Sequence, residues 1–243
     1  MPYSPEEKKI CQALSKVAFI VVILLVFSLI WMYFAHLYWI VFEEVTRTGI
    51  FWTSIGLIIA FGVLFDLIKS SLTSPGFSTD LEIPVDKHEI CEICKYYKPP
   101  RSHHCSLCEK CILEMDHHCP WINNCVGYYN RKYFYRFILW VIAGSAFLAI
   151  ITAPSIFIIA FNPLEFEKQY SENTKKIIMF VFSLGFAVTL VVGLLLGFQA
   201  YLIVTQQSTV EYYKKRTINP GYCRRLVSRI AVMLSKKEEK NRI

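Results

Sequence analysis

Cysteines and histidines gather in one short segment of the chain. Seven of the nine cysteines and four of the six histidines lie between Cys91 and Cys125. Thiolate sulfur and imidazole nitrogen are common zinc ligands, and two tetrahedral zinc sites use eight of them, so three of these eleven groups are surplus. Near the end of the segment a carboxylate, an imidazole and a thiol stand almost side by side, in the run Asp116-His117-His118-Cys119. The segment therefore combines metal ligands with residue types that suit nucleophilic chemistry.

The spacing of the cysteines is typical of metal-binding turns. Cys91 and Cys94 form one Cys-x-x-Cys pair, and Cys105 and Cys108 form a second. Each pair directs two thiolates at one ion from a short turn. Cys108 also begins a third, overlapping pair with Cys111. Spacing alone therefore indicates metal binding without showing which cysteine is surplus.

Four apolar runs surround this segment. The chain of 243 residues is 54% hydrophobic, and its mean hydropathy is +0.39. A helix needs roughly 20 apolar residues to cross the hydrocarbon core of a bilayer. We predict an all-α integral membrane protein with four transmembrane helices and a small irregular Cys-rich domain. The predicted spans are residues 17–40, 50–68, 134–161 and 177–204.

The basic residues predict the orientation of these spans. Of the 26 lysines and arginines, 22 lie before the first span, between Lys69 and Arg136, or from Lys214 onward. Loops rich in lysine and arginine face the cytosol. We therefore expect the N-terminal residues 1–16, the loop 69–133 and the tail 205–243 to be cytosolic. Most of the net charge of +7 would then face anionic lipid or a phosphorylated ligand. The sequence has no basic region with aromatic side chains on which bases could stack, so it does not predict nucleic-acid binding.

A cytosolic position favours metal over disulfides, because thiols there are kept reduced. The loop between the second and third spans has few apolar residues with which to build a core of its own. Bound zinc supplies folding free energy on the order of 10 kcal/mol per site. We expect two structural zinc ions within about residues 89–130.

The segment resembles the Cys-rich domain of the DHHC protein S-acyltransferases (palmitoyltransferases). About 40 contiguous residues carry nearly every signature position of that family. The matching runs are Cys91-Glu92-Ile93-Cys94, Lys98-Pro99-Pro100-Arg101-Ser102-His103-His104-Cys105 and Asp116-His117-His118-Cys119-Pro120-Trp121-Ile122-Asn123-Asn124-Cys125-Val126-Gly127. Four spans with this domain in the middle cytosolic loop extend the resemblance to most of the chain.

The resemblance implies two interleaved ligand sets. One zinc would take Cys91, Cys94, His104 and Cys111, and the other would take Cys105, Cys108, His118 and Cys125. His103, His117 and Cys119 are then surplus, which leaves the spare cysteine beside a spare histidine and Asp116. His103 receives no role.

The surplus residues predict a nucleophile and its base. A free thiol, with a pKa of about 8.5, attacks poorly at neutral pH unless a base takes its proton. We predict Cys119 as the nucleophile, His117 as the base and Asp116 as the group that orients His117, as in other catalytic triads. In the family the position of Thr209 supports that aspartate. Because Asp116, His117 and Cys119 are close neighbours in the sequence, we expect a bent backbone, imposed by the zinc sites, to bring their side chains together.

The resemblance implies transfer of an acyl group in two steps. Cys119 would take a long-chain acyl group, such as palmitoyl, from acyl-CoA and pass it to a cytosolic cysteine of a membrane-associated protein. Trp121 would line the mouth of an acyl cavity. Gly144 opens a run of three small residues roughly 16 Å along the third helix, at the depth where the family limits acyl length, and we expect it to admit chains at least as long as palmitate. Lys98 and Arg101 are predicted contacts for the CoA phosphates.

Three motifs depart from the family pattern. The family's Asp-Pro-Gly is here Ser74-Pro75-Gly76, and its Thr-Thr-x-Glu is here Ser208-Thr209-Val210-Glu211. Asn219-Pro220 resembles the start of the C-terminal motif, but the asparagine expected further on is not evident within residues 221–233. That basic and apolar stretch predicts a helix lying on the membrane surface.

Two other functions remain open from the sequence. A catalytically inactive zinc-domain scaffold in the membrane is compatible with the altered C-terminal motif. A metal transporter with a metal-sensing loop would need ionisable residues deep in its spans, and the chain offers little beyond Asp66 and His36. The family resemblance implies residence in endomembranes such as the Golgi or ER.

Overall fold

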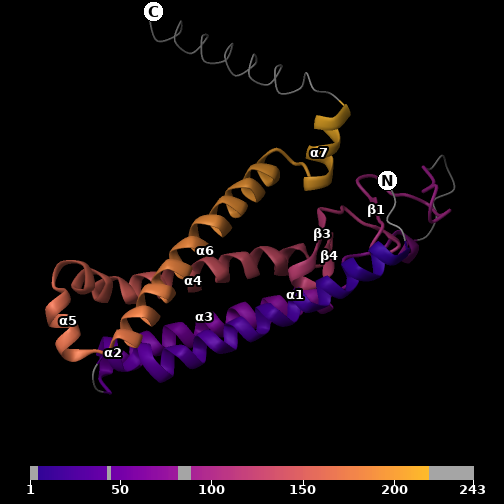
Figure 1. Ribbon diagram of the computed structural model, residues 1–243. Coiled ribbons are helices and arrows are strands. Elements are labelled where there is room, and N and C mark those ends of the chain that lie inside the picture. The colour runs from indigo at the N-terminus through magenta and orange to yellow at the C-terminus, as the bar shows by residue number, and fades with distance from the viewer. Residues whose placement is uncertain (1–4, 43–44, 82–88, 219–243) are drawn as a thin grey trace, which may run out of the picture.

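A computed structural model describes residues 5–42, 45–81 and 89–218 of the protein. The described residues are predominantly helical (Figure 1). The helices are α1 Pro5–Met32, α2 Tyr38–Phe42, α3 Arg47–Leu72, α4 Arg131–Phe161, α5 Pro163–Gln169, α6 Glu172–Val204 and α7 Thr209–Ile218, with a π-helical turn at Tyr33–Leu37 and short 3-10 turns at Ser78–Asp80 and Pro120–Ile122. The C-terminal stretch for which we predict a surface helix lies outside the described residues.

Four of the described helical segments are long and apolar enough to cross a membrane: Pro5–Leu37, Arg47–Leu72, Arg131–Phe161 and Glu172–Val204. The predicted fold class, a four-helix membrane protein with a small Cys-rich domain, is confirmed. The helix α1 begins at Pro5, well before the predicted span that starts at residue 17. This extension of α1 runs alongside the Cys-rich domain at one end of the bundle, while α2 and α5 lie at the other end (Figure 1).

The Cys-rich domain is built on two antiparallel hairpins. The strands are β1 His103–Cys105, β2 Lys110–Ile112, β3 His117–Cys119 and β4 Asn124–Val126, and β1 pairs with β2 while β3 pairs with β4. In the first hairpin His104 lies opposite Cys111. In the second, His118 lies opposite Cys125. Each hairpin thus places one histidine and one cysteine directly across from each other.

Two asparagines attach this domain to the end of α3. The last carbonyl groups of a helix have no partner within the helix. Asn124 donates from Nδ2 to the carbonyl oxygens of Ser71 at 2.9 Å and Thr73 at 3.0 Å. Asn130, which is fully buried, donates to the carbonyl oxygens of Ser70 at 3.0 Å and Cys125 at 2.8 Å. These bonds fix the second hairpin against the end of the α3 membrane helix.

The acidic residue Asp66 is paired within the helices. It is only 2% exposed, and its carboxylate accepts hydrogen bonds from the guanidinium of Arg136 and, at 3.2 Å, from the indole nitrogen of Trp140. This ion pair joins α3 to α4. Asp66 therefore gives the transporter alternative no support.

Candidate active site

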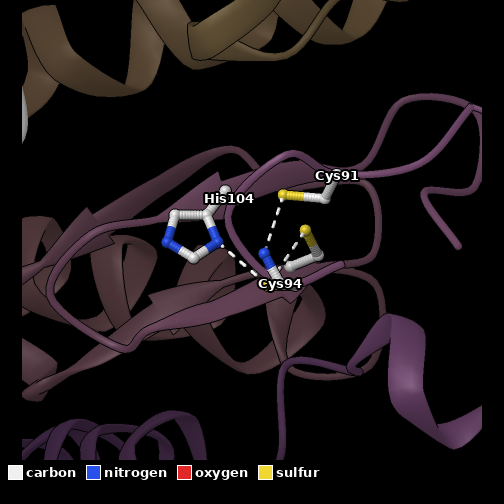
Figure 2. Close-up of side chains that lie close together, drawn as sticks. Cys91, Cys94 and His104 are labelled. Atoms are coloured by element: carbon white, nitrogen blue, oxygen red, sulfur yellow. Dashed lines mark hydrogen bonds between the residues drawn. The ribbon is translucent and has the colours of Figure 1, made fainter. Parts of the chain in front are cut away.

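The first Cys/His cluster brings together Cys91, Cys94, His104 and Cys111, whose ligand atoms all lie within 4.8 Å of one another. His104 directs Nδ1 at the sulfur of Cys94, 3.1 Å away. The sulfur of Cys91 accepts the backbone N–H of Cys94 at 3.5 Å, as expected for a Cys-x-x-Cys turn (Figure 2). Three thiols and one imidazole are a ligand set that suits a tetrahedral zinc ion.

The second cluster consists of Cys105, Cys108, His118 and Cys125, whose ligand atoms also lie within 4.8 Å of one another. His118 directs Nδ1 at all three sulfurs, at 3.8 Å from Cys105, 3.4 Å from Cys108 and 3.5 Å from Cys125. This set has the same chemistry as the first. The structure therefore groups the cysteines and histidines into the two sets that the family resemblance implies.

Strand geometry explains why the two sets interleave. Successive side chains of a strand point to opposite faces. His104 and Cys105 are neighbours in β1 and belong to different clusters. The same alternation in β3 sends His118 to the second cluster and leaves His117 and Cys119 together on the other face. The expectation that a bent backbone brings the three side chains together is therefore wrong for His117 and Cys119, which share one face of an extended strand, whereas Asp116 lies before that strand and still reaches His117.

Asp116 lies immediately before β3 and is held by four hydrogen bonds. Its Oδ2 accepts from His117 Nδ1 at 2.7 Å, from Thr209 Oγ1 at 3.0 Å and from Gln199 Nε2 at 3.3 Å, and its Oδ1 accepts from the backbone N–H of Thr209 at 2.7 Å. Burial alone would raise the pKa of Asp116, but the bonds from His117 and Thr209 outweigh burial and lower the pKa. The carboxylate is therefore charged at neutral pH.

A capping box explains why Thr209 reaches Asp116. Ser208 precedes α7 and accepts the backbone N–H of Glu211 at 3.2 Å, while Glu211 accepts the backbone N–H of Ser208 at 2.8 Å. This reciprocal pattern starts a helix, and the positive end of the helix favours a nearby anion. The Ser208-Thr209-Val210-Glu211 run thus keeps the start of α7 beside Asp116, although its first residue is serine.

His117 lies between the carboxylate and the thiol. Burial would lower the pKa of His117, but hydrogen bonds to Asp116 and Cys119 outweigh burial and raise the pKa to about 9. The ring also meets the ring of Phe134 edge to face, with centroids 5.2 Å apart. A charged imidazole beside a cysteine stabilises the reactive thiolate form. The geometry is therefore that of a Cys-His-Asp triad.

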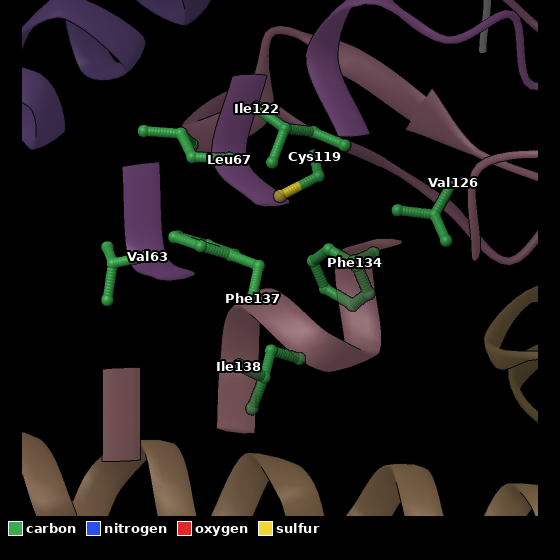
Figure 3. Packing of buried hydrophobic residues seen from close by; sticks show 8 residues of the cluster. All are labelled: Val63, Leu67, Cys119, Ile122, Val126, Phe134, Phe137 and Ile138. Carbon is green, nitrogen blue, oxygen red and sulfur yellow. The ribbon is translucent and has the colours of Figure 1, made fainter. Parts of the chain in front are cut away.

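Cys119 lies in an apolar environment. The residue is 4% exposed and belongs to a cluster of buried side chains from α3, α4 and the second hairpin (Figure 3). Leu67, Phe134 and Phe137 surround its sulfur in this view. A thiol placed among hydrocarbon side chains suits a substrate whose reacting atom carries an apolar chain.

An apolar cavity of about 700 Å³ opens from this site into the helix bundle. His117 and Cys119 line it together with side chains from α1, α3, α4 and α6. Along α4 the lining runs from Phe134 to Leu148, which is about 21 Å of helix at 1.5 Å per residue. Trp121 and Gly144, the two residues predicted to contact the acyl chain, both line the cavity. Tyr33 and Thr53 lie in the lining at the opposite end from Cys119, joined by a hydrogen bond of 2.8 Å.

The predicted CoA contacts lie at the edge of the Cys-rich domain. Arg101 donates from Nε and Nη2 to the carboxylate of Glu211, at 3.0 Å and 3.2 Å, and so ties this edge to α7. Lys98 lies 4.0 Å from Glu89. Both side chains remain partly exposed. Arg101 thus already has a partner within the protein, Glu211, in addition to any contact with phosphate.

Gln199 is a further contact of Asp116 that the sequence did not predict. This residue of α6 is 2% exposed, and besides its bond to Asp116 its Oε1 has no partner among the described residues. The signal in the sequence was a polar amide within an otherwise apolar span. Buried polar side chains in membrane helices commonly serve function, and here the amide donates a hydrogen bond to the carboxylate of Asp116.

Comparison with known proteins assigns the chain to a family. The family model described as DHHC palmitoyltransferase matches residues 84–216, which is more than half of the 243 residues and contains both clusters and the triad. The chain belongs to the DHHC palmitoyltransferase family.

Curated relatives share the same region. A probable protein S-acyltransferase 16 of Arabidopsis thaliana is 34% identical over 144 residues, which are 56% of this chain and 49% of the relative. The palmitoyltransferase ZDHHC16A of Danio rerio is 37% identical over 113 residues, 44% of this chain and 29% of the relative. The palmitoyltransferase ZDHHC2 of Homo sapiens is 35% identical over 131 residues, 54% of this chain and 34% of the relative. In each case the match covers less than half of the relative.

Proposed function

We propose that the protein is a protein S-acyltransferase that carries a long-chain acyl group, such as palmitoyl, on Cys119. The observation that supports this most strongly is the position of Cys119, which faces an apolar cavity and shares a strand face with His117. His117 in turn is bonded to Asp116 at 2.7 Å. A nucleophile at the mouth of an apolar cavity that follows about 21 Å of α4 is an arrangement that suits an acyl-CoA thioester.

In the first step the thiolate of Cys119 attacks the thioester carbonyl of acyl-CoA. A new carbon–sulfur bond forms to Cys119, the bond to the CoA sulfur breaks, and the CoA thiolate leaves. The proton held by His117 is available to this leaving thiolate. The hydrocarbon tail lies in the cavity, where burial of each CH₂ group contributes about 0.8 kcal/mol.

In the second step a cysteine thiol of a membrane-associated protein attacks the acyl-Cys119 thioester. His117 takes the proton of that thiol, the acyl group moves to the substrate sulfur, and Cys119 leaves as a thiolate. Both steps exchange one thioester for another and are nearly balanced in energy. The main task of the protein is therefore positioning, which Asp116, Thr209 and Gln199 support by fixing the imidazole.

We further propose that each Cys/His cluster holds one structural zinc ion. The donor sets fit this ion, with three thiols and one imidazole nitrogen in each. Four protein ligands leave no open coordination position, which is typical of structural rather than catalytic zinc. Bound zinc supplies folding free energy, and residues of this chain carry out every chemical step.

The distribution of lysine and arginine supports a cytosolic position for both termini and for the Cys-rich domain. In that orientation Cys119 would meet acyl-CoA and substrate cysteines at the cytosolic surface of an endomembrane such as the Golgi or ER. The lipid bilayer, acyl-CoA and membrane-associated proteins with cytosolic cysteines are the proposed partners.

Incubation of the purified full chain with labelled palmitoyl-CoA tests the proposal. We expect label on wild type that neutral hydroxylamine releases, because hydroxylamine cleaves thioesters. The variant Cys119→Ser should carry no such label, while its zinc content should stay at two ions per chain. The matched control Cys11→Ser alters a cysteine of α1 outside both clusters and should label like wild type.

Equal labelling of wild type and Cys119→Ser would exclude Cys119 as the nucleophile. Absence of label on a zinc-loaded wild type, with no transfer to any membrane protein supplied, would instead favour the inactive scaffold.

The variant Gly144→Phe should shift acyl preference toward shorter chains. Gly144 and Ile59 both line the cavity, and a Cβ atom added at Gly144 would lie 3.2 Å from Ile59 Cγ2, so we expect a phenyl ring there to narrow the cavity. Each excluded CH₂ group costs about 0.8 kcal/mol of binding, so removal of two should change the ratio of myristoyl to palmitoyl transfer by roughly 10-fold. Mass spectrometry of acyl-Cys119 after competition between the two CoA esters measures this ratio.

The variant Gly193→Phe is the control, because a Cβ atom there meets nothing within 4 Å and Gly193 does not line the cavity. Its chain preference should match wild type. A Gly144→Phe protein with wild-type preference would contradict the placement of the acyl chain.

A further inference from the structure

The second Cys/His cluster has an outer partner that comes from α1. His118 faces the three sulfurs of its cluster with Nδ1. Its other ring nitrogen, Nε2, lies 3.3 Å from the hydroxyl oxygen of Ser15. Ser15 is 2% exposed, so water does not compete for this hydroxyl. The residue lies in the part of α1 that precedes the predicted first span and is 103 positions away from His118 in the sequence.

The chemistry of the ring sets the direction of this hydrogen bond. When Nδ1 binds a metal, the proton of a neutral imidazole is on Nε2. Nε2 of His118 then donates to Ser15, which accepts through its oxygen. Partners of this kind hold the orientation and tautomer of a ligating histidine and typically change metal affinity by about 10- to 100-fold when they are removed.

Two further contacts place the same stretch of α1 against the turn between β1 and β2. Gln12 donates from Nε2 to the carbonyl oxygen of Leu107 at 2.8 Å. Lys8 forms an ion pair with Glu109. Lys8, Gln12 and Ser15 are spaced by four and three residues, which places them on one face of a helix. This face of α1, defined by those three residues, thus contacts both His118 and the turn that carries Cys108.

We propose that Ser15 is a positioning residue for the second zinc site and, through His118, for the catalytic strand. This proposal rests on the proposed zinc occupancy. His118 lies between His117 and Cys119 in β3, so the orientation of its ring fixes the strand that presents both catalytic side chains. Because α1 also lines the apolar cavity through Val22, Leu25 and Val26, one rigid helix joins the cavity wall to the metal site.

Zinc release from the purified full chain tests the proposal. We expect Ser15→Ala to release one of its two zinc ions to a chelator at least about 10-fold faster than wild type, while the other ion leaves at the wild-type rate. Alkylation with N-ethylmaleimide, followed by peptide mass spectrometry, identifies the site. Cys105, Cys108 and Cys125 should become reactive faster, whereas Cys91, Cys94 and Cys111 should keep their wild-type rates.

Two variants of the same helix act as controls. Ser15→Thr keeps a hydroxyl group and should retain most of the protection that Ser15→Ala loses. Ser28→Ala removes an exposed hydroxyl that is bonded to the carbonyl oxygen of Leu25 within α1, and it should behave as wild type. The pattern of one affected site and rescue by threonine separates a role toward His118 from general loosening of the fold.

The variant Gln12→Ala gives an independent measurement. It leaves the Ser15 hydroxyl in place and removes the bond to Leu107, so we expect faster alkylation of the second cluster by a smaller factor than in Ser15→Ala. Equal zinc release and alkylation rates in wild type and Ser15→Ala would overturn the proposal. Equal acceleration at both clusters would overturn it as well. A wild-type chain without zinc would instead refute the proposed zinc sites themselves.

Discussion

The variant Asp116→Asn should form the Cys119 acyl-enzyme about 10⁴-fold more slowly than wild type, the loss seen for the same change in a Ser-His-Asp triad. Asp116 accepts hydrogen bonds from His117, Thr209 and Gln199. An asparagine has only one acceptor oxygen, and its amide group would face donors. The imidazole of His117 would then lose the partner that fixes its tautomer. Single-turnover kinetics with labelled palmitoyl-CoA measure this rate.

A matched control is Asp80→Asn, which alters the acidic residue that accepts the backbone N–H of Phe77 at 3.2 Å in the same loop. This variant should acylate at the wild-type rate. Zinc content should be two ions per chain in both variants, because Asp116 belongs to neither Cys/His cluster. A loss of less than 10-fold in Asp116→Asn would mean that His117 needs no carboxylate partner.

The variant Cys108→Ala should lose the second zinc ion together with the fold of the Cys-rich domain. Cys108 is one of four donors in its cluster, and its removal opens a site that otherwise excludes water. A structural zinc ion contributes on the order of 10 kcal/mol, whereas whole domains are stable by only about 5–15 kcal/mol. Zinc analysis, together with limited proteolysis of the loop between α3 and α4, measures both effects.

The control for this variant is Cys11→Ala, because Cys11 lies in α1 and outside both clusters. It should keep two zinc ions and the wild-type proteolysis pattern. A Cys108→Ala protein that retains two zinc ions and full acylation would refute the structural role of the metal.

Residue type and spacing were sufficient to predict the metal-binding chemistry. Thiols and imidazoles at Cys-x-x-Cys spacing have few other uses in a reducing compartment, and four long apolar runs have few other uses than spanning a membrane. Both predictions are confirmed at the level of four candidate spans and two four-donor clusters. The division of ligands came from resemblance, because spacing cannot show which face of β1 or β3 a side chain takes.

Contacts between residues that are far apart in the chain could not be predicted from the sequence. Gln199 and Ser15 are ordinary polar residues in their local context, one within an apolar span and the other just before one. Their contacts arise from packing, since Gln199 meets Asp116 across 83 positions and Ser15 meets His118 across 103. Local periodicity carries no information about such pairs. The sequence also did not show that strand alternation alone places His117 and Cys119 on one face.

The alternation of side chains along β3 links the completeness of the second Cys/His cluster to the direction in which Cys119 faces. A shift of one residue in strand register moves every side chain to the opposite face. After such a shift His118 would face the cavity, and His117 and Cys119 would face the three sulfurs of the second cluster. In the native register His118 lies opposite Cys125, and only this pairing completes the four-donor set. If the second cluster holds zinc as proposed, chains that retain this ion are chains in which Cys119, the proposed nucleophile, faces the apolar cavity.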